Sequence, residues 1–111
     1  MEQQLSEIAK NMADSILVNK NASQQAISVA LQVAHIAWNF VHEEYEEEPG
    51  YINGVVEIQE AMRSVKSDFV TQDAADLIER LMKYKLRHHP NDKRAIFACQ
   101  YEKGKVMVTW R

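Results

Sequence analysis

The histidines of the central segment are the side chains whose type best suits metal binding. His35 and His42 stand seven residues apart, which on a helix separates them by about 10.5 Å along the axis at 1.5 Å per residue. That separation is too long for both side chains to ligate one ion. A carboxylate di-iron site in a helical bundle needs Glu followed three residues later by His, whereas positions 32 and 39 hold Gln and Asn. We therefore expect no metal site.

A run of carboxylates offers a second kind of chemistry. Glu43, Glu44 and Glu47 have a spacing that is similar to the EExxE motif of the all-α nucleotide pyrophosphatases of the MazG type. That family places a second acidic pair, ExxD, on the next helix to hold Mg²⁺ against phosphates. The matching pair here is Asp73 and Asp76, with Asp in place of the Glu. The resemblance implies a Mg²⁺-dependent nucleotide pyrophosphatase, which is a remote alternative among the functions considered.

Nucleophilic catalysis has one candidate, the thiol of Cys99. This residue stands in the middle of an expected strand, where a thiol is normally protonated and unreactive. The chain also has no glycine-rich phosphate loop and no CxxC, GxSxG or HExxH motif. We therefore expect no catalytic residues, no cofactor and a protein that is not an enzyme.

The net charge of −3 is divided unevenly along the chain. Residues 1–60 carry ten acidic and two basic side chains, and residues 61–111 carry six acidic and eleven basic ones. Residues 42–48 form an acidic pole, in which Glu43, Glu44 and Glu47 are candidates for binding a basic partner. An immunity protein, an antitoxin or a mimic of nucleic acid presents carboxylates in this way, so this class of function is one alternative.

The basic pole consists of residues 80–94, which include Lys85, His88 and His89. Clustered Lys and Arg favour nucleic acid or an acidic protein as a partner. A sequence pI near 5.8 and the scarcity of aromatic residues within the cluster argue against nucleic acid. This second alternative uses the candidate contact residues Arg80, Lys83, Arg87, Lys93 and Arg94.

Four helices are expected to position these groups. Apolar residues at helical spacing predict helices over residues 3–18, 22–45, 52–67 and 72–88. Asn21 or Ser23 is expected to cap the second helix and Thr71 the fourth. The fourth helix should end near His88 and His89, because the residue before a proline avoids the α conformation.

The helix expected over residues 22–45 is apolar around most of its circumference. Its polar residues recur at steps of three or four and form one narrow stripe: Gln25, Ser28, Gln32, His35, Asn39, His42 and Glu46. A helix with this pattern lies at the centre of a fold. The stripe is then its single edge facing solvent or a partner.

The apolar period changes to alternation in the last part of the chain. This change predicts a two-stranded antiparallel hairpin over residues 94–110 with the two-residue turn Lys103-Gly104. One face, which should cover the helices, carries three cross-strand pairs: Tyr101 with Val106, Cys99 with Val108, and Phe97 with Trp110.

The other face of the hairpin suggests self-association. It retains Ile96, Ala98 and Met107, and residues 95–101 carry no charge that would repel another copy. An open strand edge also exposes backbone groups that a neighbour can satisfy. We therefore expect a homodimer in which two hairpins join edge to edge or pack through this face.

These observations favour one class of protein over the others. The 111 residues suit a single domain, residues 1–111, with a mainly α (α+β) fold of four helices and a C-terminal hairpin. The first residues resemble no signal peptide, one cysteine suits a reducing compartment, and no apolar stretch is long enough for a membrane. We expect a cytoplasmic, non-catalytic interaction protein that binds another protein and itself.

Overall fold

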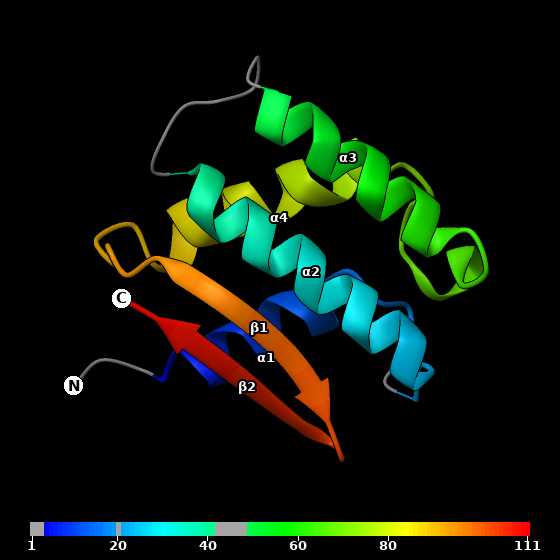
Figure 1. The fold of residues 1–111 in the computed structure, drawn as a ribbon, viewed down its shortest axis with the longest axis horizontal. Helices are drawn as coiled ribbons and strands as arrows, with labels where there is room; N and C mark the ends of the chain where they lie inside the picture. The colour runs from blue at the N-terminus through cyan, green and yellow to red at the C-terminus, as the bar shows by residue number, and fades with distance from the viewer. Residues whose placement is uncertain (1–3, 20, 42–48) are drawn as a thin grey trace.

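The computed structural model of the chain describes residues 4–19, 21–41 and 49–111. It has the expected architecture, four helices and a C-terminal antiparallel hairpin (Figure 1). The elements follow one another in the order α1 (Leu5–Ser15), α2 (Gln24–Phe40), α3 (Pro49–Met62), a short 3₁₀ turn (Lys66–Asp68), α4 (Ala74–His88), β1 (Ile96–Glu102) and β2 (Lys105–Trp110).

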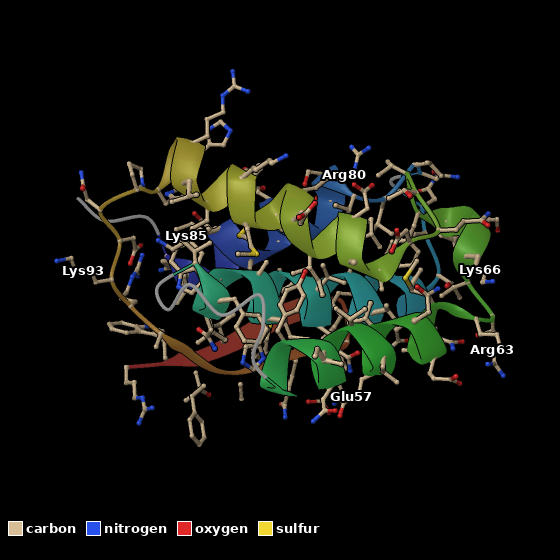
Figure 2. All side chains as sticks on the ribbon, turned by 90° about the horizontal axis from the view of Figure 1, so that it is seen from above. Glu57, Arg63, Lys66, Arg80, Lys85 and Lys93 are labelled. Atoms are coloured by element: carbon tan, nitrogen blue, oxygen red, sulfur yellow. The ribbon has the colours of Figure 1, made fainter. Side chains whose placement is uncertain are left out.

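Helix α2 is the central element, as its nearly continuous apolar surface predicts. It packs directly against α1, α3, α4 and β1. In the view of Figure 1, α3 and the hairpin lie toward the front of α2, and α1 and α4 lie behind it. Figure 2 shows these two layers from above. Its residues Ala30, Val33, Ala34, Ala37 and Trp38 are almost completely inaccessible to solvent, and small alanines at this density allow neighbouring elements to approach closely.

The first helix is shorter than the expected range of residues 3–18. It ends at Ser15, because the following residues pair with the chain that precedes α4. Leu17 forms an antiparallel bridge with Phe69, and the Val70 N–H donates to the Ile16 carbonyl. Extended backbone therefore replaces the last turn of the expected helix.

The helix ends show which caps the chain uses. Ser23 caps α2 by accepting a hydrogen bond from the Ala26 N–H, as one of the two alternatives predicted. Asp73, and not Thr71, caps α4 by accepting from the Ala75 N–H. Helix α3 begins at Pro49, earlier than the expected residue 52, since proline is well tolerated in the first turn of a helix.

The hairpin turn forms at Lys103 and Gly104 as predicted. Both residues have positive φ, +52° and +78°, which is the conformation that a two-residue turn between antiparallel strands requires. The pairs Tyr101–Val106 and Cys99–Val108 are also confirmed.

The predicted pairing of Phe97 with Trp110 is wrong. A β-bulge between Ile96 and Ala98 inserts Phe97 as an extra residue, so Ile96 stands opposite Trp110 and Ala98 opposite Thr109. Because a one-residue shift exchanges the two faces of a strand, Ile96 turns inward and is only 3% exposed, while Phe97 turns outward and is 69% exposed. Ile96, expected on the outer face, therefore belongs to the core.

Asn39 fastens the start of the hairpin to α2. Its side-chain amide donates to the Ile96 carbonyl over 2.8 Å and accepts from the Ile96 N–H over 2.9 Å. The amide thus forms with β1 the two hydrogen bonds that a neighbouring strand would form. Among the described helices, none is long and apolar enough to cross a membrane.

Replacing Asn39 by Asp should destabilise the fold by about 1–3 kcal/mol, because the carboxylate cannot donate to the Ile96 carbonyl, which is left without its partner. Urea unfolding at neutral pH measures the change. The matched control is Gln32→Glu, which adds the same charge to the same stripe at an exposed position and should change stability by no more than about 0.5 kcal/mol. Equal losses in the two variants would contradict this account of Asn39.

Candidate functional site

The hairpin is held against the helices by the segment that leads into it. Lys85 of α4 is only 1% exposed, and its ammonium donates to the carbonyls of His89 and Asp92 over 2.9 and 2.7 Å. The same ammonium lies 4.4 Å from the centroid of the Trp38 ring, a favourable position for a cation. Burial lowers the pKa of Lys85, an effect that the nearby Asp92 charge opposes. This lysine, expected in the basic pole, is therefore part of the interior.

A second set of contacts fixes the same segment. The Trp38 indole N–H donates to the Arg94 carbonyl over 2.6 Å, and the Arg94 guanidinium forms an ion pair with Asp92, both side chains being nearly buried. Hydrogen bonds from Arg94 lower the pKa of Asp92. The guanidinium also lies 5.2 Å from the centroid of the Trp110 ring. Arg94 therefore holds the two ends of the hairpin together and is not a free member of a basic surface.

The outward face of the hairpin exposes large apolar side chains. Phe97 is 69% exposed and Met107 is 49% exposed, and Ala98, next to Phe97 on the strand, is partly exposed. We call Phe97, Ala98 and Met107 the hairpin patch. Trp110 is 50% exposed, but it stands opposite Ile96 and therefore lies at the exposed end of the inward face. Ala98 and Met107 were predicted for this face; Phe97 was missed because nothing in the strand pattern indicates the bulge.

The inward face of β1 contains the single cysteine. Cys99 is half-buried, and burial raises the pKa of its thiol to about 11. The described residues place no group near it that lowers this pKa. A thiol with a raised pKa carries little thiolate at neutral pH.

A shallow groove separates β1 from the exposed stripe of α2. Helix and strand run antiparallel side by side (Figure 1), so that Asn39 and His35 lie near Ile96, whereas Ser28 and Gln32 lie near the far end of β1. The groove has a volume of about 400 Å³ and is lined by Ser28, Gln32 and residues 99–102. Burial lowers the pKa of His35, and a hydrogen bond with the Ile96 backbone acts in the opposite direction. Of the stripe predicted as an edge, Ser28 and Gln32 face this groove, whereas the Gln25 side-chain amide donates to the Ser64 hydroxyl.

Half of the Lys and Arg side chains in the basic pole have partners within the protein. Arg80 is paired with Asp76, Arg94 with Asp92, and Lys85 is buried. Lys83, Arg87 and Lys93 are exposed. Figure 2 shows Lys93 at one end of the protein and the basic side chains Arg63 and Lys66 at the other.

The acidic candidates are only partly described. Glu43, Glu44 and Glu47 lie outside the described residues, and so do His42 and Glu46. Asp73 caps α4 and Asp76 pairs with Arg80, so each has a structural role. Within residues 4–19, 21–41 and 49–111, no three His, Cys, Asp or Glu side chains are grouped as metal ligands.

Comparisons of the chain with models of protein families, with curated proteins and with solved structures found no match.

Replacing Lys85 by Met should destabilise the protein by about 3 kcal/mol, because the carbonyls of His89 and Asp92 lose a charged donor in a buried position. Thermal unfolding at neutral pH gives the difference. Lys83→Met, an exposed substitution on the same helix, should cost no more than about 0.5 kcal/mol. A Lys85 variant as stable as the Lys83 variant would contradict the structural role of this ammonium.

The Cys99 thiol should react slowly with iodoacetamide at pH 8. Its pKa of about 11, against an ordinary 9.0, leaves about 100-fold less thiolate than an exposed cysteine has. The rate is measured by mass spectrometry, with Ser67→Cys/Cys99→Ser as the exposed control. The rate at Cys99 should rise with pH to above pH 10. A plateau near pH 9 would contradict the raised pKa.

Proposed function

We propose that this chain is a small non-catalytic interaction domain that binds another protein, including a second copy of itself, through the hairpin patch. The observation that carries the proposal is the exposure of Phe97 and Met107 on a hairpin whose position is fixed by partly buried polar contacts. Aromatic residues and methionine are enriched in the cores of protein interfaces.

The conformation of the hairpin supports this role. The bulge turns Ile96 into the core and Phe97 toward solvent. A large aromatic side chain is therefore exposed on a strand whose inward face still packs against the helices. Ala98 beside it is small, which permits close approach of a second surface. A pre-organised apolar face loses little conformational entropy on binding.

Nucleic-acid binding through the basic pole receives less support. Three of its six Lys and Arg side chains have internal partners: Arg80, Lys85 and Arg94. A nucleic-acid surface needs several cations presented together. The alternatives that use the acidic pole, including the pyrophosphatase, depend on residues outside those described and remain hypotheses from the sequence.

Self-association is tested by light scattering across a range of protein concentrations. We expect a dimer for the wild type and at least a 10-fold increase in the dimer dissociation constant for Ala98→Lys, because a lysine at the centre of an apolar interface must be desolvated. The control Ser67→Lys adds the same charge on the exposed 3₁₀ turn, remote from the hairpin, and should leave the dimer intact. A monomeric wild type would exclude self-association, and a dimer insensitive to Ala98→Lys would exclude the hairpin patch as its surface.

A further inference from the structure

The edge of β1 that faces away from β2 has hydrogen-bonding groups available for another strand. In a two-residue hairpin the residues that close the turn form a hydrogen-bonded pair, and such pairs alternate with pairs whose N–H and C=O groups point outward. Glu102 and Lys105 close this turn, so Cys99 and Tyr101 direct their backbone groups to the open edge. They lie two residues apart, which is the repeat of an added strand.

The other end of the same edge is already occupied by an amide. Before the bulge, Ala95 and Arg111 exchange two hydrogen bonds, so the next residue, Ile96, points its N–H and C=O outward. Both groups are bound by the Asn39 side chain. The outward N–H and C=O groups of Ile96 therefore have hydrogen-bond partners. The Asn39 amide takes the place there that a neighbouring strand would take at Cys99 and Tyr101.

The groove between α2 and β1 lies beside the outward-pointing N–H and C=O groups of Cys99 and Tyr101. Its lining includes Cys99 and Tyr101, and opposite them the side chains of Ser28 and Gln32. Ser and Gln both donate and accept hydrogen bonds, so they suit the second edge of an incoming main chain. Residues 95–101 have no charge, and Glu102 is the only charged residue of the lining. The chemistry of the groove thus favours peptide groups and uncharged side chains.

The surrounding elements favour a single strand as the occupant. In the view of Figure 1, α3 and β1 flank α2, one above it and one below it. Figure 2 shows that both also lie toward the front of α2. One added strand extends a sheet by about 4.8 Å. A second copy pairing through its own β1 would bring a second hairpin, and by two-fold symmetry its own α2, to the same edge. The helices on both sides would obstruct that approach.

We propose that this groove binds one extended, uncharged polypeptide segment of a partner protein, which adds to β1 as a third strand. Its backbone pairs with Cys99 and Tyr101, and its far edge meets Ser28 and Gln32. This mode of recognition obtains affinity from main-chain hydrogen bonds. The site differs from the hairpin patch, which is on the opposite face of the sheet, so it does not depend on the function proposed above.

The test uses a defined probe, the acetylated and amidated hexapeptide Thr-Val-Thr-Val-Thr-Val, added to the whole protein at millimolar concentration. Amide hydrogen exchange followed by NMR should slow at least 10-fold at Cys99 and Tyr101, with little change at Gln100, whose N–H is already in the hairpin. The same peptide N-methylated at every residue keeps its carbonyl acceptors, but its methylated nitrogens cannot donate and its methyl groups prevent close approach of the two strands, so it should leave all three amides unchanged. Both peptides are added to the wild-type protein, so the comparison does not depend on whether a variant folds.

Matched variants locate the site. Gln32→Trp fills the groove from an exposed position and should abolish the protection, whereas Gln24→Trp, exposed on the same helix outside the lining, should retain it. Ala98→Lys should also retain it, which separates failure of the groove from failure of the hairpin patch.

Three results would overturn the proposal. The first is unchanged exchange at Cys99 and Tyr101 with the unmethylated peptide, and the second is equal protection by the methylated peptide. The third is protection that grows with protein concentration in the absence of peptide, which would identify a second copy as the occupant.

Discussion

The buried ammonium of Lys85 is the constraint on which the arrangement of the hairpin depends. A lysine that loses its water must find other acceptors and a favourable field, and here they are the carbonyls of His89 and Asp92 and the face of Trp38. Those carbonyls belong to the chain between α4 and β1. The hydrogen bonds from the ammonium therefore also fix the position of that segment. The strand therefore begins at a defined position beside α2.

The sequence predicts the elements better than it predicts their contacts. Hydrophobic period is a local property, so the central helix and the turn at Lys103 and Gly104 are evident from the sequence. In the sequence Lys85 is one more charge in a basic run, because its burial depends on carbonyls and an indole that only folding brings together. The bulge at Phe97 is equally non-local. The apolar residues alternate without interruption in the sequence, and only the packing of Ile96 in the core shifts the register of the strand.

The stripe of α2 illustrates how one sequence pattern serves several purposes. It was expected as an edge facing solvent or a partner, and the structure divides it along its length. Asn39 and His35 meet the backbone of Ile96, whereas Ser28 and Gln32 border an open groove. The same residue class therefore anchors a strand at one end and leaves hydrogen-bonding capacity at the other. Spacing alone cannot separate these two roles.

The contacts that secure the hairpin join residues far apart in the chain. Trp38 and Arg94 are separated by 56 positions, and Asn39 and Ile96 by 57. Long closures are entropically costly and form late in folding, whereas α1 and α2 are neighbours in sequence. All four described helices are synthesised before the strands. The contacts of Trp38 and Asn39 with the hairpin segment can therefore form only after residues 94–96 have been made, 56 and 57 positions later.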